Sequence, residues 1–423
     1  MRILVVGNGA REDALSWRLA QSASCEALFA APGNAGTASR GKNWDIAATD
    51  GKGILERVQA EKIDLVVLGP ESAIAAGVGD RLRDAGVLVF GPNRSSGRLE
   101  SSKTFSKRFM QRHGVPTARA EVVHSLQAAN AALDGWQGDG VVVKADGLAA
   151  GKGVVVCNSV DEARAVLGDW YGKNKIPGGG ADVLVEERLE GREVSVFALA
   201  DGRAMVPLAA ACDYKRAGDG DTGPNTGGMG AYSPPHGFPE DLFDQVRERI
   251  LAPVLRGLLA ESEVYIGVLY CGLMWTNDGP MVIEFNARFG DPETQVLMPR
   301  ISGDFAGLLK SCADGAMDLS LASLTEQQCV GIVLASRDYP RSSTPLQGLN
   351  PDVALGDGVQ AFWGASSLDG GTVRSSGGRV LTVSALGEDL HAARTRAYDA
   401  VHALADRIGT RDLSYRTDIA KLE

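Results

Sequence analysis

Short apolar runs that end in glycine recur along the first hundred residues. Residues 2–6, 63–68 and 87–90 are mostly apolar, and a glycine directly follows each run. Residues with helical spacing lie between them. Strands that alternate with helices predict a doubly wound parallel sheet, and such sheets bind ligands at the carboxyl ends of their strands.

From about residue 101 the pattern changes to paired strands and longer helices. Helices are predicted at 101–112, 240–260 and 388–407, and a long glycine-rich loop at 213–237. The other predicted strands are 141–144, 153–157, 182–187, 193–199, 266–275, 281–286, 330–336, 359–363 and 379–386. We therefore expect an α/β chain with an N-terminal domain at 1–100, a middle domain at 101–325 and a small C-terminal α+β domain at 326–423.

Composition and charge narrow the class of protein. The 423 residues include 53 glycines, and such an excess indicates tight turns and close approach of backbone to ligands. The net charge of −10 argues against a nucleic-acid or membrane surface, because both need a basic excess. No apolar stretch approaches the ~20 residues of a membrane span, and the apolar run at the start is too short for a signal peptide.

The spacing of cysteines and histidines argues against a zinc site. No two of the six cysteines have CxxC spacing, and no two of the five histidines have HxxxH spacing. We expect a reduced, cytoplasmic protein. Any catalytic metal should be a hard cation bound by oxygen ligands.

The segment GNGARE, which begins at Gly7, partly matches a dinucleotide fingerprint. Glu12 stands where GxGxxG requires its third glycine, so nicotinamide binding is disfavoured. A helix N-terminus after a strand still suits a phosphate group, and Arg11 would add charge-assisted bonds. A plain tight turn is the alternative interpretation.

The segment KADGLAAGKG at 144–153 resembles a Walker A loop only superficially. Asp146 and Gly153 occupy the positions of the first glycine and of the Ser/Thr. A glycine-rich turn between two strands can instead cover a triphosphate, with Lys144 at the end of its strand pointing at phosphate. Solvent exposure of this lysine is the alternative.

The segment MVIEFNARFGDPETQ at 281–295 carries the strongest metal signal. Side chains two residues apart share one face of a strand, so Glu284 and Asn286 point the same way and Arg288 would continue that face. A carboxylate and an amide oxygen suit Mg²⁺, which takes further ligands from water and substrate phosphates. Arg288 could hold a carboxylate or neutralise charge during transfer. A plain polar strand face is the alternative.

The loop at 212–232 is rich in glycine, aspartate and lysine. Gly227, Gly228 and Gly230 could present successive backbone N–H groups as an anion-binding nest. A mobile surface loop is the alternative.

These segments together resemble one enzyme family. The motifs that carry the resemblance occur in the order LVVGNGARE, APGNAGT, LGPE, LESSKTFSKRFM, VVKADGLAAGKGV, LVEERLEGREVSVF, DYKR, DTGPNTGGMGAYSP, VIEFNARFGDPETQ and SGGRVLTV. They are similar to the glycinamide ribonucleotide synthetases (phosphoribosylamine–glycine ligases) of the ATP-grasp superfamily, from residue 1 to about residue 420. DTGPNTGGMGAYSP and EFNxRFGDPETQ are specific to this family within the superfamily.

The resemblance implies a fold and a reaction. It implies an N-terminal substrate-binding domain, an ATP-grasp domain of two α+β lobes with its lid lobe at about 121–190, and the C-terminal domain. ATP, glycine and 5-phosphoribosylamine would give ADP, phosphate and glycinamide ribonucleotide in de novo purine synthesis, through glycyl phosphate. Such chemistry needs positioning and charge neutralisation rather than a protein nucleophile. Mg²⁺ or Mn²⁺, no nucleic acid, no membrane and a monomer or weak homodimer are expected.

The resemblance also assigns roles by position. The ATP-binding residues would be Lys107, Lys144, Gly147, Gly151, Lys152, Gly153, Glu186, Glu187, Leu189 and Glu193. The metal ligands would be Glu284 and Asn286, and the catalytic residues Arg288, Lys144, Asp213 and Lys215. The substrate-binding residues would be Gly9, Arg11, Asn34, Gly36, Glu71, Asn225, Thr226, Gly227, Gly228, Met229 and Arg288.

Five positions depart from the pattern of the family. Asp13 and Trp363 stand where the family has histidines, Ala10 and Ala420 stand where it has glycines, and Ala73 replaces a proline. They affect the expected phosphoribosylamine pocket and the C-terminal domain, but not the ATP or metal motifs. The alternatives are another ATP-grasp carboxylate–amine ligase, such as a biotin-carboxylase-like or formate-dependent enzyme, and a catalytically silent nucleotide-binding protein.

Overall fold

The N-terminal segment forms a parallel sheet of five strands in a computed structural model of the chain. The structure describes residues 1–423 except 137, 139, 149–152, 351–354, 409–412 and 422–423. The strand order is β3-β2-β1-β4-β5. The bounds are β1 Arg2–Gly7, β2 Ala27–Pro32, β3 Lys42–Asn43, β4 Leu65–Leu68 and β5 Val89–Phe90.

Helices connect these strands, which confirms the predicted doubly wound sheet. They are α1 Ala10–Ala20, α2 Ala35–Ala38, α3 Gly51–Glu61, α4 Glu71–Ala75 and α5 Val78–Asp84. β1 lies between β2 and β4, so α1, α2 and α4 begin around one crevice at the carboxyl ends of these strands. Gly9, Asn34 and Glu71 are therefore brought together at this edge. β2 was not among the predicted strands, because its run ALFAAP is rich in alanine, which favours helix as much as strand.

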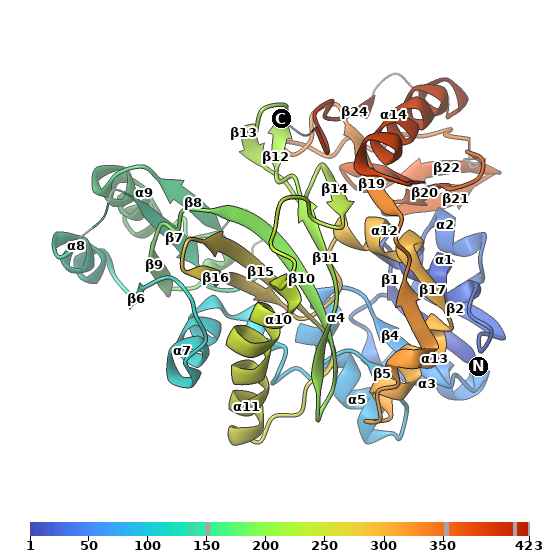
Figure 1. Cartoon of the computed structure of the whole chain (residues 1–423), viewed down its shortest axis with the longest axis horizontal. Helices are drawn as coiled ribbons and strands as arrows, with labels where there is room; N and C mark the ends of the chain where they lie inside the picture. The colour runs from blue at the N-terminus through green and yellow to red at the C-terminus, as the bar shows by residue number, and fades with distance from the viewer. Residues whose placement is uncertain (137, 139, 149–152, 351–354, 409–412, 422–423) are drawn as a thin grey trace.

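The segment predicted as the lid lobe follows two short helices, α6 Arg98–Ser101 and α7 Lys103–His113. The helix predicted at 101–112 is therefore interrupted, because the side chain of Ser102 caps the start of α7. The lobe contains an antiparallel sheet in the order β6-β9-β7-β8, which projects away from the rest of the chain (Figure 1). Its elements are β6 Ala120–Val123, α8 Leu126–Asp134, β7 Val141–Ala145, β8 Val154–Cys157, α9 Val160–Gly172, the 3-10 turn Pro177–Gly179 and β9 Val183–Glu187.

A long sheet runs from the middle of the chain into its C-terminal part. Its strand order is β16-β15-β10-β11-β14-β19-β23-β20, and β24 also pairs with β19. The bounds are β10 Arg192–Asp201, β11 Met205–Asp213, β14 Gly230–Ser233, β15 Ile266–Thr276, β16 Gly279–Asn286, β19 Gln328–Ser336, β20 Val359–Trp363, β23 Arg379–Gly387 and β24 Leu413–Ser414. The C-terminal strands thus extend the sheet of the middle segment, and the exact domain boundaries stay a prediction.

Two predicted elements differ from the structure. The expected loop at 213–237 contains three short strands, β12 Arg216–Gly218, β13 Thr222–Asn225 and β14, because its glycines allow tight hairpins. The helix expected at 240–260 starts at Leu242. It runs as α10 Leu242–Val246, a π-helical turn Arg247–Leu251 and α11 Ala252–Ala260.

The remaining elements cover the sheets. They are α12 Glu293–Leu297, the 3-10 turn Met298–Arg300, β17 Ile301–Gly303, α13 Phe305–Ala313, the 3-10 turn Leu319–Leu321, β18 Ala322–Leu324, β21 Ser366–Asp369, β22 Thr372–Ser375 and α14 Leu390–Arg407. Among the described helices, none has the length and apolar character of a membrane span.

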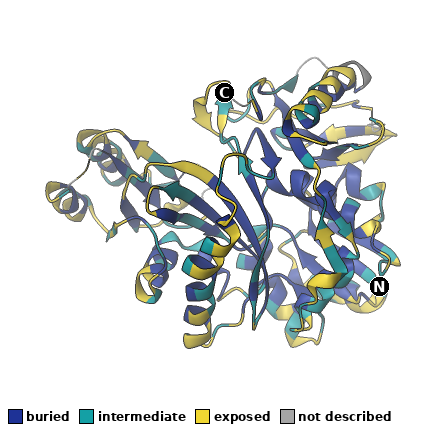
Figure 2. Cartoon of the chain, viewed as in Figure 1, coloured by how far each residue is buried: buried dark blue, intermediate teal, exposed yellow. Residues whose placement is uncertain are grey.

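The N-terminal and long sheets share their apolar cores. Ile3 and Val5 of β1 belong to the same buried cluster as Phe197, Tyr270 and Phe289. The buried strands of the long sheet form the dark centre of the molecule in Figure 2. Each fully buried large apolar side chain contributes about 1.5–3 kcal/mol. This shared core fixes the segment 7–13 against the segment 286–293.

Candidate functional site

Strand β16 presents the three polar side chains expected to share a face. Glu284, Asn286 and Arg288 are half-buried, and they alternate with the buried Phe285 and Ala287. The strand ends at Asn286, but the guanidinium of Arg288 still donates a hydrogen bond to Oδ1 of Asn286 over 3.2 Å. The predicted common face is confirmed.

Cations from several elements surround this face. Burial opposes ionisation of Glu284, but Lys215, Lys144, Lys103 and Arg288 outweigh it and lower the pKa of this carboxyl. Glu284 is therefore charged at neutral pH. A charged carboxylate beside an amide oxygen fits a hard cation, which would take its other ligands from phosphate and water. Among the described residues, no cluster of three His, Cys, Asp or Glu side chains could hold a metal alone.

Two lysines share one buried carboxylate below the lid lobe. Lys107 of α7 and Lys144 of β7 lie with their Nζ atoms 3.2 Å and 2.7 Å from the two carboxylate oxygens of Glu186 on β9. Lys144 also donates to the carbonyl of Ile283 on β16 over 3.0 Å, which connects the lid lobe to that strand. Burial lowers the pKa of Lys107, and Glu186 offsets part of this effect.

A second charge network lies at the end of β11. Lys215 Nζ is 2.6 Å from Glu193 Oε2 on β10. Burial raises the pKa of Asp213 to about 7, Lys215 lowers it, and Glu293 and Glu193 raise it further. Burial disfavours the charged form of Lys215, but Asp213, Glu193 and Glu284 together raise its pKa well above the usual value. Lys215 stays charged, and Asp213 titrates near neutral pH.

Arg288 connects this site to the N-terminal domain. Its Nη2 lies 3.0 Å from Glu100, and its Nε lies 3.4 Å from Glu71. Nε makes no hydrogen bond of good geometry among the described residues, and the Glu71 carboxylate is its ion-pair partner. Burial opposes the charge of Arg288, but Glu100 and Glu71 raise its pKa. Arg11 Nη1 also approaches Glu71, at 4.0 Å.

The carboxylates beside Arg288 differ in their ionisation. Burial raises the pKa of Glu100, and Arg288 only partly offsets it. Burial also opposes ionisation of Glu71, but Arg288 and Arg11 outweigh it and lower the pKa of that carboxyl.

The loop from Asn225 to Met229 is held by the C-terminal part of the chain. Arg379, at the start of β23, donates to the carbonyl of Gly227 over 2.7 Å and to Asp291 Oδ2 over 2.8 Å. The N–H of Gly227 donates to the Tyr339 hydroxyl over 2.9 Å, and that of Gly228 donates to Thr226 Oγ1 over 3.0 Å.

The predicted anion nest in this loop is wrong. The N–H groups of Gly227 and Gly228 already have protein acceptors, and Gly230 belongs to strand β14. Glycine is nevertheless required at 228, where φ is +108° and a Cβ would lie 2.3 Å from Cδ of Pro292. The loop thus packs closely against the turn that follows β16.

At the N-terminal edge, the side chain of Asn34 makes hydrogen bonds within the protein. Its amide nitrogen donates to the carbonyls of Asn8, Gly9 and Trp363 at 3.1, 3.0 and 2.7 Å. Its oxygen accepts from the N–H of Thr37. The hydrogen bonds of Asn34 therefore link the turn around Gly9 and the start of α2 to strand β20.

A steric contact explains why position 36 is a glycine. A Cβ at this position would lie 1.9 Å from the carboxylate of Asp13. The role of Gly36 in substrate binding stays a prediction.

The remaining ATP residues expected from the sequence lie around the lid. Gly147 has a φ of +92° with open space beside it, Glu187 is exposed at the end of β9, and Leu189 is half-buried. Gly153 is buried. Gly151 and Lys152 lie outside the described residues.

Sequence reasoning missed the residues that act over long separations. Arg379, Tyr339 and Asp291 form the clamp on the 225–229 loop, and no local spacing brings them together. Glu293 was also missed, although it lies in a quoted motif. It is buried and accepts from the Tyr270 hydroxyl over 2.7 Å, and its charge acts on Asp213. The one sequence signal for Arg379 was the motif SGGRVLTV, which is part of the family resemblance and contains this residue. No role had been assigned to it.

Three family models match successive parts of the chain. They are the N domain of phosphoribosylglycinamide synthetase at residues 1–100, its ATP-grasp (A) domain at 101–294 and its C domain at 329–422. Curated relatives are similar over their full length. A phosphoribosylamine–glycine ligase of Phenylobacterium zucineum is 44% identical and covers 98% of this chain and 99% of its own. One from Neisseria meningitidis serogroup A is 42% identical, with 99% of each chain covered.

Solved structures agree with these relatives. The crystal structure of a phosphoribosylamine–glycine ligase from Thermotoga maritima has a TM-score of 0.85 and 32% identity, and covers 99% of this chain and 100% of its own. The biotin carboxylase domain of a Hydrogenobacter thermophilus 2-oxoglutarate carboxylase, bound to MgADP and bicarbonate, has a TM-score of 0.73, with 95% and 89% covered. At 14% identity it shows the fold alone.

Proposed function

The chain belongs to the phosphoribosylglycinamide synthetase family, and from this premise we propose how its residues join glycine to 5-phosphoribosylamine at the expense of ATP. The family resemblance expected from the sequence is confirmed. The chain acts as an ATP-dependent ligase of purine biosynthesis that uses a divalent metal. The family match disfavours both alternatives, the other ATP-grasp ligases and the silent nucleotide-binding protein.

One observation carries the proposed mechanism. Lys144 of the lid, Lys215 two residues after β11 and Arg288 two residues after β16 all act electrostatically on the carboxylate of Glu284. Phosphoryl transfer from a triphosphate, and acyl transfer from the acyl phosphate that it forms, both need such a concentration of positive charge, since negative charge builds up on the reacting oxygens. Positions on separate elements let the site hold two substrates in line.

The ATP phosphates would lie against Lys107 and Lys144. In the structure Glu186 provides the counter-charge to both lysines. The phosphates would share this role, under the loop that begins at Gly147 and ends at Gly153. Glu187 ends β9 and Leu189 lies on the connection toward β10. We place adenine against these two residues, and Glu193 would contact the ribose.

Glu284 and Asn286 would hold Mg²⁺, or Mn²⁺ in its place. A bound divalent cation neutralises the phosphate oxygens and aligns them. The two side chains are half-buried and share one strand face, which supports the assignment. The charge of Arg288 next to Asn286 would neutralise the acyl phosphate from the other side.

Glycine would bind between β11 and Arg288. We propose that its carboxylate attacks the γ-phosphorus, with ADP leaving, to give glycyl phosphate. The amine of 5-phosphoribosylamine then attacks the glycyl carbonyl carbon, and phosphate leaves. The carboxylate of Asp213 can accept a hydrogen bond from the glycine ammonium. The charges of Lys215 and Arg288 can attract carboxylate or phosphate oxygens, and the 225–229 loop closes this side.

The phosphoribosylamine would enter along the N-terminal edge. Gly9, Arg11 and Glu71 lie at the carboxyl ends of β1 and β4 and reach Arg288 through Glu71. Asn34 and Gly36 support this edge. We further propose a monomer or weak homodimer, which sedimentation at micromolar concentration would test.

The test of the mechanism uses glycine labelled with ¹⁸O in its carboxylate. Glycyl phosphate formation requires one labelled oxygen to appear in the phosphate released per turnover. Unlabelled phosphate alongside product would refute the intermediate but not the ligase activity. In parallel, Glu284→Ala should lose metal-dependent turnover while keeping its fold, and near wild-type activity would remove Glu284 from the metal site.

A further inference from the structure

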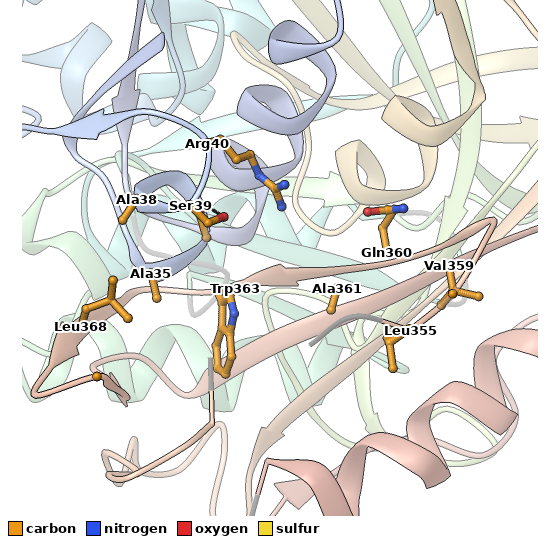
Figure 3. Close-up of a pocket in the computed structure, with 13 residues that line it drawn as sticks. Ala35, Ala38, Ser39, Arg40, Leu355, Val359, Gln360, Ala361, Trp363 and Leu368 are labelled. Atoms are coloured by element: carbon orange, nitrogen blue, oxygen red, sulfur yellow. Dashed lines mark hydrogen bonds between the residues drawn. The ribbon is translucent and has the colours of Figure 1, made fainter. Parts of the chain in front are cut away.

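A cavity of about 580 Å³ lies between α2 and strand β20, outside the cluster of charges described above. Its volume is in the range of small-molecule sites, roughly 300–1,000 Å³. Among its described lining residues, Gly36 is a predicted substrate-binding residue, and Trp363 is one of the departures from the family pattern. Figure 3 shows Arg40 and Gln360 on the side of α2, with Trp363 extending from β20 toward the other side.

Arg40 offers one complete edge of its guanidinium to this cavity. Its Nε donates to Oδ1 of Asp13 over 2.7 Å, and Asp13 is fully buried. The other oxygen of Asp13 accepts the N–H of Trp363 over 2.8 Å, so the carboxylate is fixed. Neither Nη1 nor Nη2 of Arg40 bonds to a residue in the described part of the chain. This free pair of donors matches an oxyanion in bidentate geometry.

Strand β20 adds backbone groups, because it is the last strand of the long sheet. The N–H and C=O of Trp363 point away from β23 and pair with Asp13 and Asn34. In an antiparallel strand, alternate residues turn their backbone groups to the same side. Those of Ala361 must therefore point the same way, and no described residue pairs with them. Ala361 is nevertheless buried, and unpaired backbone groups in such a place are uncommon.

Gln360 completes the donor set. Its side chain is half-buried, makes no hydrogen bond to a described residue and extends from β20 into the space facing Arg40 (Figure 3). The donors thus come from the segment just after α2, from a side chain of β20 and from the strand edge. Such divergent origins suit a tetrahedral phosphate with three free oxygens better than a planar carboxylate.

We propose that this cavity binds the phosphate of a small phosphate monoester, at a site separate from the reaction centre. The Arg40 edge and the Gln360 amide contact the phosphate oxygens, and the Ala361 carbonyl accepts a hydroxyl of the same molecule. The site depends on a departure from the family pattern, since a histidine at position 13 would not provide the anion that holds Arg40.

The test reads out binding at Trp363, which lines the cavity. The full chain is labelled with 5-fluorotryptophan, its six ¹⁹F signals are recorded, and Trp363→Phe assigns the relevant one. Methyl phosphate is titrated without ATP, and sodium chloride and sodium acetate are titrated separately at matched ionic strength. We expect a saturable shift of the Trp363 signal with methyl phosphate and a clearly weaker response to acetate.

Two substitutions at one position make the test specific. Gln360→Glu places a carboxylate against the phosphate without touching the Asp13–Arg40 pair, and should weaken binding about tenfold or more. Gln360→Met, the uncharged control, should stay within about threefold of wild type because it loses one neutral hydrogen bond. Both melting temperatures are measured to establish that the variants fold.

The proposal is overturned by any of three results: no saturable shift with methyl phosphate, an equal response to acetate, or equal binding by Gln360→Glu and wild type. None of these results bears on the ligase reaction, because ADP release is not the readout. Failure of the ligase assay would likewise leave this binding experiment unaffected.

Discussion

Replacing Glu186 by glutamine tests the charge balance at the proposed ATP-phosphate position. The carboxylate lies between Lys107 and Lys144, and all three side chains are no more than 5% exposed. Glu186→Gln keeps the shape but removes the negative charge, so two ammonium groups remain close together in a poorly solvated place. We expect a less stable protein.

The magnitude follows from the burial. Breaking a buried ion pair costs about 3–5 kcal/mol, and we take about 3 kcal/mol because the amide oxygen still accepts one hydrogen bond. The unfolding entropy is about 2.1 cal/mol/K per residue, or roughly 0.9 kcal/mol/K for 423 residues. The melting temperature should therefore fall by about 3 °C if the chain unfolds as one unit, and by more if the lid lobe unfolds separately.

The loss of stability in Glu186→Gln should depend on pH and on ATP. Burial already lowers the pKa of Lys107, and the loss of Glu186 lowers it further. A lysine whose pKa is depressed in the folded state destabilises it at low pH, so the deficit should shrink as pH rises toward 10. Mg-ATP supplies new negative charge to both lysines and should raise the melting temperature more in Glu186→Gln than in wild type.

Differential scanning fluorimetry with and without Mg-ATP measures both effects. Glu187→Gln is the matched control for stability of the free protein, because Glu187 is exposed on the same strand. A melting temperature of Glu186→Gln within about 1 °C of wild type would refute the charge argument. An unchanged ATP shift would refute the position of the phosphates.

Three further variants probe the other parts of the site. Arg379→Gln should release the loop around Gly227 and reduce kcat by about 10²-fold through misplacement of groups, and a wild-type kcat would contradict this. Asp213→Asn should remove one contribution to the pH dependence of protein stability. Because burial raises the folded pKa of Asp213 to about 7, its contribution to stability is full below about pH 4 and is lost as pH rises through 7. The melting temperature of wild type relative to the variant should fall over that window, and parallel curves would contradict the shift. Gly228→Ala should reduce stability and activity, since a Cβ would meet Pro292, whereas Gly371→Ala also has a strained positive φ, +86°, but open space. Equal melting temperatures of these two variants would contradict the steric argument.

Local periodicity accounts for the parts that could be predicted from the sequence. The apolar runs predicted β1 and β4, and the two-residue alternation predicted the common face of Glu284, Asn286 and Arg288. Both signals depend on neighbouring residues alone. The resemblance, which used whole motifs, supplied the family and the order of the domains.

The rest depends on contacts between distant parts of the chain. Asp13 and Trp363 are 350 positions apart, and no spacing rule pairs their carboxylate and N–H. The anion nest failed for the same reason, because the Tyr339 hydroxyl, 112 positions away, takes the N–H of Gly227. Likewise, β20 and β23 look like a separate unit in sequence, but backbone pairing through β14 and β19 joins them to the middle sheet.

The most direct test of the central claim is ADP release by the purified chain with Mg-ATP, glycine and freshly made 5-phosphoribosylamine. ADP should form at a rate that depends on both glycine and the amine, and in equal amount to glycinamide ribonucleotide. Release of ADP with a different acid but not with glycine would contradict the account, as would ATP binding without turnover at high enzyme concentration.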